Sequence, residues 1–291
     1  MPSQDPLAID RKAPPFDKYR GISWLAPARS GRHSHEHARH QLYVGTGRDN
    51  PVRVLIKVTS RPGLVYERDL GNEIMTLNTI NRDLPDSRHF PLAYEHGHLD
   101  DGRLYLIMSL FDEFPLATIV ETEGMSDHLV AHLMAIIEAS RAVAEIHRVG
   151  IFHVDLNPMN ILHRTEKGRP IIRIVDFESS YDRSRHSTGV FYDPPTTPGY
   201  SAPELTHQPP DARADLFSLG AVLYTMIAGF GWTWESEVAA AVDADTELDA
   251  DLKRIIRMSV HTNPEKRQAS IDVFRSALAA YLEGIWPGRA W

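Results

Sequence analysis

Residues 151–162 read Ile-Phe-His-Val-Asp-Leu-Asn-Pro-Met-Asn-Ile-Leu, and this stretch carries most of the argument about the fold. Asp155 and Asn160 stand five residues apart, and Pro158 between them turns the chain into a loop. Asp176 follows 21 residues after Asp155, at the end of an apolar run. A carboxylate that can orient a hydroxyl, with an amide and a second carboxylate that can hold Mg²⁺, is suited to phosphoryl transfer.

Phosphoryl transfer also needs a cation on a rigid element to hold nucleotide phosphates. Lys57 follows the apolar run of residues 52–56, and a buried strand there can hold the ammonium group in place. Glu73 lies in the next segment, which has helical spacing of its apolar residues, and is the natural partner of this lysine. We therefore take Lys57 and Glu73, with Asp155, as candidate catalytic residues.

Composition sets wide limits. The 291 residues carry a formal net charge of −8, so no global basic field attracts nucleic acid or an anionic membrane. Cysteine is absent, which excludes disulfides, thiolate metal sites and cysteine nucleophiles, and fits a reducing cytoplasm. Residues 1–15 are polar and proline-rich, unlike a signal peptide. We expect a cytoplasmic protein that binds neither nucleic acid nor membrane, of unknown oligomeric state.

The pattern of elements changes near residue 110. Strand-like runs at 21–25, 41–45, 52–58, 92–96 and 104–110 surround one helical segment at about 65–80. A long helix is predicted from Ser126 to about Arg148, closed by Gly150, and residues 219–232 are predicted to form a buried helix. We predict an α+β fold with a flexible tail at 1–16, a small β-rich lobe at 17–110 and a larger α-helical lobe at 111–291.

Motifs in this order, over roughly residues 17–285, resemble those of the eukaryotic-like serine/threonine protein kinase family. The matching stretches are Val54–Lys57, Asn72–Ile74, His153–Asn160, Asp176–Glu178, Thr197–Glu204, Asp215 in Ala-Asp-Leu-Phe-Ser-Leu-Gly, and Arg267 in Asn-Pro-Glu-Lys-Arg. The resemblance implies a bilobal kinase fold, and ATP and Mg²⁺ as cofactors. It implies that a protein is the substrate, with Asp155 orienting the hydroxyl and Asn160 and Asp176 holding the metal. It places the ATP site at Lys57, Leu55, Met108, Leu110, Leu162, Asn160 and Asp176. It also implies that Asp215 braces the catalytic loop and that Arg267 pairs with Glu204.

The chain departs from the family pattern at several places. Val154 stands where kinases usually carry an arginine that receives a phosphorylated activation segment, which predicts activity independent of that route. Asn157 replaces a lysine near the transferred phosphate, and Glu178 replaces a glycine, which restricts the backbone or simply faces solvent. Leu55 would crowd an adenine. Residues 27–40 contain a single glycine, so they form no glycine-rich phosphate loop.

Three functions remain open on the sequence. The first is an ATP- and Mg²⁺-dependent serine/threonine protein kinase. The second is a pseudokinase that acts as a binding or scaffold protein, favoured by the missing glycine loop, Leu55 and Asn157. The third is a small-molecule kinase of the aminoglycoside or choline type, which would not be expected to carry the Ala-Pro-Glu204 segment with Asp215 and Arg267. Hydroxyls between Ser179 and Thr196 are candidate phosphorylation sites.

Overall fold

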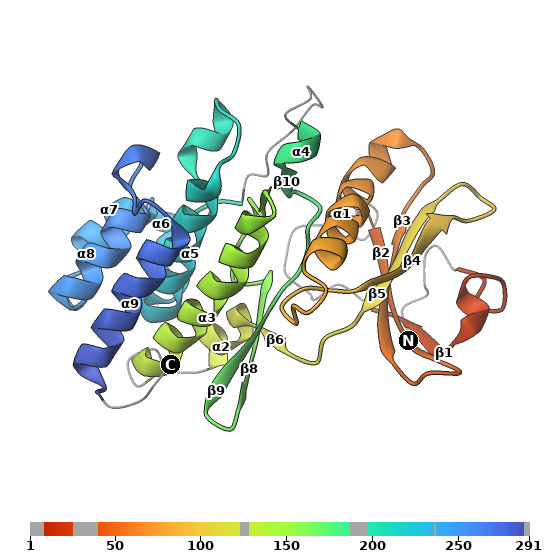
Figure 1. The fold of residues 1–291 in the computed structure, drawn as a ribbon, viewed down its shortest axis with the longest axis horizontal. Coiled ribbons are helices and arrows are strands. Elements are labelled where there is room, and N and C mark those ends of the chain that lie inside the picture. The colour runs from red at the N-terminus through yellow and green to blue at the C-terminus, as the bar shows by residue number, and fades with distance from the viewer. Residues whose placement is uncertain (1–8, 26–39, 123–127, 187–196, 236, 288–291) are drawn as a thin grey trace. The chain divides into compact units, whose positions relative to one another are not determined.

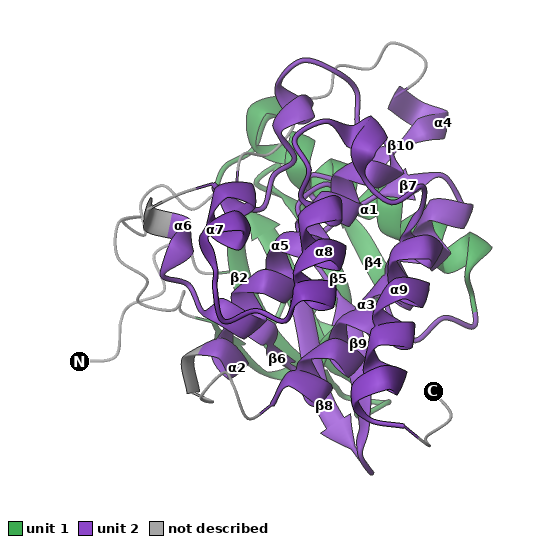
Figure 2. Cartoon of the chain, turned by 90° about the vertical axis from the view of Figure 1, so that its left-hand side faces the viewer, with its two compact units in different colours: residues 1–85, 91–112 green, residues 86–90, 113–291 purple. Residues whose placement is uncertain are grey.

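The computed structural model describes residues 9–25, 40–122, 128–186, 197–235 and 237–287. The chain divides into two compact units, residues 1–85 with 91–112, and residues 86–90 with 113–291 (Figure 2). We had expected one boundary at residue 110. The structure places it after Asp112 and also assigns the short segment 86–90 to the second unit.

The first unit is a five-stranded antiparallel sheet with one long helix (Figure 1). The strands follow the order β1-β2-β3-β5-β4, and α1 contacts β3, β4 and β5. The elements of this unit are β1 (Tyr19–Trp24), β2 (His40–Gly47), β3 (Arg53–Thr59), α1 (Leu64–Asp83), β4 (Ala93–His98) and β5 (Leu104–Ser109). Each strand predicted from the sequence is present, with bounds shifted by a few residues.

Side chains alternate across β3, which gives the sheet two different faces. Val54, Ile56 and Val58 belong to a buried cluster on one face, whereas Leu55 and Lys57 are on the other. The same cluster includes Ile9 and Phe16, which are 4% and 2% exposed. Residues 9–16 therefore pack on the sheet and are not part of the flexible tail expected for residues 1–16. Two apolar side chains seven residues apart carry no periodic signal that would reveal this packing.

We expect Phe16→Ala to destabilise the first unit by about 3–5 kcal/mol, because the ring is buried and meets Tyr105 edge-on at 5.9 Å between ring centroids. Denaturant unfolding of the full chain measures this change. Leu64→Ala is the matched control, since Leu64 is 85% exposed and its removal leaves no cavity. Equal midpoints for the two variants would show that the segment before β1 does not contribute to the folded unit.

The second unit is mostly helical, with short strands near its start. Its helix α3 packs against α5, α9 and β9, and α5 also contacts α8. The longer elements are α3 (Leu129–Arg148), β8 (Ile161–Glu166), β9 (Arg169–Ile174), α5 (Ala212–Ala228), α7 (Val238–Ala244), α8 (Ala250–Ser259) and α9 (Ile271–Ile285). The shorter ones are β6 (Phe114–Pro115), α2 (Leu116–Thr122), β7 (Ile151–Phe152), β10 (Tyr181–Asp182), α4 (Arg183–His186) and α6 (Trp232–Glu235), with 3-10 turns at Pro203–Thr206 and Pro264–Lys266.

The ends of α3 and α5 can be compared with the helix bounds predicted from the sequence. Gly150 follows α3 with φ of +79°, a conformation that glycine adopts without strain, as its predicted role as a helix stop requires. The buried helix predicted at 219–232 begins earlier, at Ala212, because the Asp211 side chain accepts a hydrogen bond from the amide of Arg213. It ends earlier, at Ala228, because Gly229 also has a positive φ. No described helix is long and apolar enough to cross a membrane.

Candidate catalytic site

Lys57 and Glu73 meet in the first unit as an ion pair. Lys57 projects from β3 and its Nζ lies 2.7 Å from Oε2 of Glu73 on α1. The two side chains are 8% and 0% exposed, so each charge depends mainly on the other for compensation. The structure thus brings together the strand lysine and helix glutamate that the sequence paired across 16 positions.

The apolar residues predicted near the nucleotide fall into two sets. Leu55 is paired with Met108 across β3 and β5, and the two therefore share the face of the sheet that carries Lys57. Leu110 follows β5, and its amide donates to the carbonyl oxygen of Arg53 at 3.2 Å. Leu162 lies on β8. Asn160 and Asp176 belong to the same second unit.

Asp155 is the centre of a hydrogen-bonded loop in the second unit. The Asn160 Nδ2 donates to the carbonyl oxygen of Asp155 at 2.9 Å and lies 3.4 Å from Oδ2. Asn157 donates from Nδ2 to the same carbonyl at 3.1 Å, and its Oδ1 accepts from the amide of Met159 at 2.9 Å. Asn157, which replaces a lysine of the family pattern, is therefore used inside the loop.

Asp215 fastens the start of this loop from α5. Its carboxylate accepts hydrogen bonds from the amides of His153 at 2.8 Å and Val154 at 2.7 Å, and His147 Nε2 lies 2.8 Å away. Val154 has φ of +70°, which is strained for a β-branched residue, and the bond to Asp215 helps to hold it there. Burial alone would raise the pKa of Asp215. The hydrogen bonds from His147 and from the backbone amide of Val154 outweigh burial, so the pKa of Asp215 is lowered.

The pKa of Asp155 is raised above its ordinary value, chiefly because burial disfavours the charged carboxylate. Thr197 opposes this shift: its Oγ1 donates to Oδ1 of Asp155 at 2.5 Å and favours the charged form. The negative charge of Asp176 raises the pKa further. A bound cation would offset the effect of this charge on Asp155.

Asp176 and the residues after it explain why Glu178 is tolerated. The positive φ in this stretch, +69°, occurs at Asp176, and Glu178 has an ordinary negative φ. The restriction that we expected from replacing a glycine therefore does not arise at this backbone. Phe177 is fully buried, and its ring contacts His153 at 4.8 Å between centroids. The Nε2 of His153 lies 3.0 Å from the carbonyl oxygen of Val175, so His153 is a packing and bracing residue.

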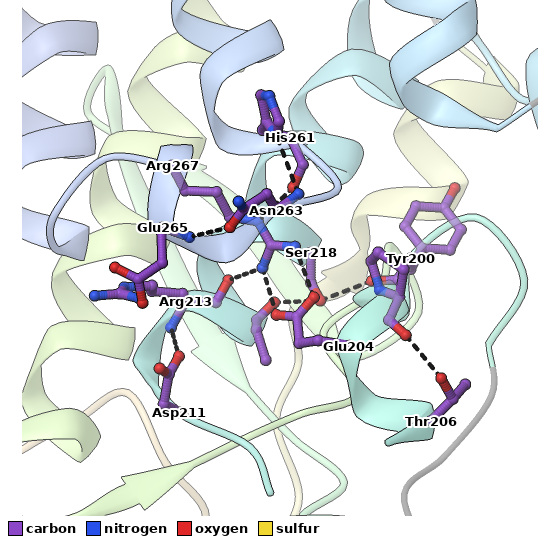
Figure 3. A network of polar contacts seen from close by, with 12 residues as sticks. Tyr200, Glu204, Thr206, Asp211, Arg213, Ser218, His261, Asn263, Glu265 and Arg267 are labelled. Atoms are coloured by element: carbon purple, nitrogen blue, oxygen red, sulfur yellow. Dashed lines mark hydrogen bonds and ion pairs between the residues drawn. The ribbon is translucent and has the colours of Figure 1, made fainter. Parts of the chain in front are cut away.

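Glu204 and Arg267 form a buried ion pair in which both carboxylate oxygens accept hydrogen bonds (Figure 3). Nη1 and Nη2 of Arg267 donate to the two carboxylate oxygens at 2.6 and 2.7 Å. The guanidinium also donates to the carbonyl oxygens of Arg213 and His261, both at 2.8 Å, and lies over the Phe217 ring. The pair implied by the family pattern is therefore formed, and it joins segments 63 residues apart in the sequence.

Two polar residues of this region were not singled out from the sequence. His147 carries no local signal, because its partner Asp215 is 68 residues away. Asp182 is one of many acidic residues, and only its short-range donors, described below, distinguish it. The structure does not describe most of the loop at residues 27–40, which contains Arg29, Arg32, Arg39 and several histidines. The candidate phosphorylation sites Ser187, Thr188 and Thr196 also lie outside the described residues.

Comparison with known proteins identifies the family of this chain. The family described as protein kinase domain matches residues 66–280. Human ribosomal protein S6 kinase alpha-2 is 37% identical over 210 residues, 65% of this chain and 28% of that protein. Serine/threonine-protein kinase Pkn1 of Myxococcus xanthus is 31% identical over 198 residues, 62% of this chain and 28% of that protein. The chain thus spans little more than a quarter of either relative.

A solved structure supports the fold. The kinase domain of Mycobacterium tuberculosis PknI, solved as a point mutant, aligns with a TM-score of 0.65 at 20% identity and covers 94% of this chain and 98% of that one. The predicted α+β kinase fold, with a β-rich first part and a helical second part, is confirmed by this match. The chain belongs to the protein kinase family, among relatives that are eukaryotic-like serine/threonine kinases.

Proposed function

We propose that this chain transfers the γ-phosphate of ATP to serine or threonine hydroxyls of a protein, with Mg²⁺ as cofactor. The observation that carries the proposal is the intact loop of Asp155 and Asn160, fastened by Asp215 and approached by the Thr197 hydroxyl. The buried Lys57–Glu73 pair in the first unit supports it, since a decayed enzyme has no need to keep a buried ion pair.

The residues present suit the cofactor. The Asn160 amide nitrogen is bonded to Asp155, which leaves its Oδ1 as the atom to bind Mg²⁺, and Asp176 supplies a carboxylate. Oxygen ligands of this kind match a hard divalent cation, and the mutual repulsion of Asp155 and Asp176 favours a positive charge between them. When bound, Mg²⁺ neutralises charge on the phosphates during transfer.

We assign the protein groups the following roles in this reaction. Lys57, oriented by Glu73, binds nucleotide phosphates, and Leu55, Met108, Leu110 and Leu162 contact the adenine. Asp155 orients the substrate hydroxyl and accepts its proton as the new P–O bond forms and ADP departs. Thr197 holds the Asp155 carboxylate in place and favours its charged form. Val154 is fully buried, so the loop offers no cation for a phosphorylated segment at that position.

A pseudokinase is the second candidate, and Leu55 favours it. This side chain shares a sheet face with Lys57 and Met108, where a smaller residue would leave more room for adenine.

A radiolabelled ATP transfer assay with Asp155→Asn as the control tests the proposed kinase function. Transfer no greater than that of the variant, together with a rise in melting temperature on adding ATP and Mg²⁺, would favour a nucleotide-binding pseudokinase. Transfer to aminoglycosides or choline but not to protein would favour a small-molecule kinase.

Thr197→Val is expected to move the acid limb of the kcat–pH profile to higher pH. A general base works in its deprotonated form, so the rate falls as the pH drops through its pKa. Removing the Thr197 hydroxyl removes a hydrogen bond that lowers the pKa of Asp155, and the carboxylate then protonates at a higher pH. Thr197→Ser keeps the donor and serves as the control. Superimposable profiles for the valine and serine variants would exclude this coupling.

A further inference from the structure

The segment that follows Asp176 and Phe177 is attached to the strand that leads into the catalytic loop. Strand β10 pairs antiparallel with β7, with Tyr181 opposite Phe152 and Asp182 opposite Ile151. The amide of Arg183 then donates to the carbonyl oxygen of Gly150 at 3.0 Å. Because β7 ends directly before His153, any order in residues 181–183 is passed to the loop that carries Asp155.

Asp182 is the polar centre of this attachment and is 2% exposed. Its Oδ1 accepts hydrogen bonds from the amide of Ser184 at 2.8 Å and from the Ser184 hydroxyl at 2.6 Å. Its Oδ2 accepts from Nε of Arg185 at 3.0 Å. Burial alone would raise the pKa of Asp182, but these donors outweigh it and lower the pKa, so the carboxylate is charged at neutral pH.

A row of rings connects the same turn to the brace of the catalytic loop. His186 stacks on Tyr181 with 4.7 Å between centroids, and Tyr181 stacks on Phe152 at 6.2 Å. Phe152 meets His147 edge-on at 5.3 Å, and His147 is hydrogen-bonded to Asp215. The turn after β10 and the Asp215 brace therefore belong to one packed structure.

We propose that Asp182 is a positioning residue: its carboxylate orders the start of the activation segment (residues 176–204) against the catalytic loop without phosphorylation. A phosphate usually orders such a segment by supplying an anion that accepts charge-assisted hydrogen bonds. Here the anion is encoded in the sequence, and its donors Ser184 and Arg185 lie in the same turn. This inference extends the proposed kinase function, in which the buried Val154 cannot receive a phosphate.

If Asp182 has this role, phosphorylation of Ser184 would disorder the turn and would not activate the enzyme. Transfer of a γ-phosphate to Oγ of Ser184 would release ADP and replace a hydrogen-bond donor by a dianion. That dianion would lie beside the carboxylate of Asp182, and two adjacent anions repel each other. Ser184→Glu, which also replaces the donor by an anion, should therefore loosen the turn and not tighten it.

Amide hydrogen exchange tests the ordering directly, on full-length protein treated with phosphatase and shown by mass spectrometry to carry no phosphate. We expect peptides spanning residues 181–186 to be protected in the wild type. Asp182→Ala should exchange there about tenfold faster, because a charge-assisted network is lost. Ser184→Ala should show a smaller increase in exchange rate than Asp182→Ala, since the amide donor remains. Ser184→Glu should show a larger increase than Ser184→Ala. Arg183→Ala is the matched control, because Arg183 is exposed and contributes its backbone amide to the attachment.

Kinetics separate positioning from a general loss of structure. In the Asp182 variants we expect kcat/KM for the protein substrate to fall about tenfold with KM for ATP unchanged. Wild-type protein that is unprotected at 181–186 until it is phosphorylated would overturn the proposal. An Asp182→Ala variant whose amide exchange equals that of Arg183→Ala would also overturn it. If Asp182→Ala does not fold, Ser184 variants whose exchange equals that of Arg183→Ala would overturn it instead. If the wild type transfers no phosphate, the proposed function fails, while the exchange data still decide whether Asp182 orders the segment.

Discussion

Asp155→Asn is expected to lower kcat for protein phosphorylation by a factor of about 10²–10⁴, the usual contribution of a positioned general base. Asparagine has the same shape and its Oδ1 can still accept the Thr197 hydroxyl, but the amide cannot take a proton. The loop geometry therefore survives while the chemical step is lost. Radiolabelled transfer from ATP to a generic protein substrate measures the effect.

Asp211→Asn is the matched control for this change. Asp211 is in the same unit and caps α5, and asparagine caps a helix about as well, so this variant should keep both its fold and its rate. A rise in melting temperature on adding ATP and Mg²⁺ should persist in Asp155→Asn, because Asp155 is assigned to the hydroxyl, and Asn160 and Asp176 to the metal. A variant that kept the wild-type rate would show that Asp155 is not the base.

Arg267→Met is expected to destabilise the helical unit by about 3–5 kcal/mol, since it leaves the Glu204 carboxylate buried without its partner. The side chains of Arg267 and Glu204 are 0% and 5% exposed, and the carbonyl oxygens of Arg213 and His261 lose a donor as well. Methionine keeps most of the apolar contact with Phe217, so the loss reports the charge. The helical circular dichroism signal during denaturant unfolding follows the change.

Two further variants make this measurement specific. Arg213→Ala removes an arginine from the more exposed ion pair with Glu265 and keeps the carbonyl oxygen that Arg267 uses (Figure 3), so it should change stability little. The double variant Glu204→Leu with Arg267→Met should recover part of the loss, because no buried charge remains. If Arg267→Met is no less stable than Arg213→Ala, the pair does not hold the unit together.

Several parts of the fold and site were accessible to sequence analysis because neighbouring residues determine them. The spacing of Asp155, Pro158 and Asn160 predicts a loop whose polar groups meet, and they do. The apolar run of residues 52–56 predicts a buried strand that presents Lys57, and helical spacing in the next segment points to Glu73 as its partner. Gly150 marks a helix end because few other residues adopt a positive φ, whereas Gly229 ends α5 within the stretch that was predicted to be helical.

Other features could not be read from local patterns. Ile9 and Phe16 were assigned to a tail because a segment without periodicity carries no sign of the sheet face that buries it. The sequence left open whether Glu178 restricts the backbone or simply faces solvent, and the positive φ occurs two residues earlier, at Asp176. The sequence showed that Asn157 replaces a lysine, but the hydrogen bonds of its amide within the loop became visible only in the structure.

The order of motifs along the chain settled the family and the identity of the candidate chemical groups, since strand alternation, helical spacing and loop composition act over a few residues. The family pattern already implied the pair of Arg267 with Glu204. The tertiary structure alone decided that His147 meets Asp215 and that Asp182 lies beside the strand that enters the catalytic loop. Such pairs depend on how the whole backbone closes. A hydrogen bond needs its donor and acceptor within about 3 Å, a distance that sequence separation does not encode.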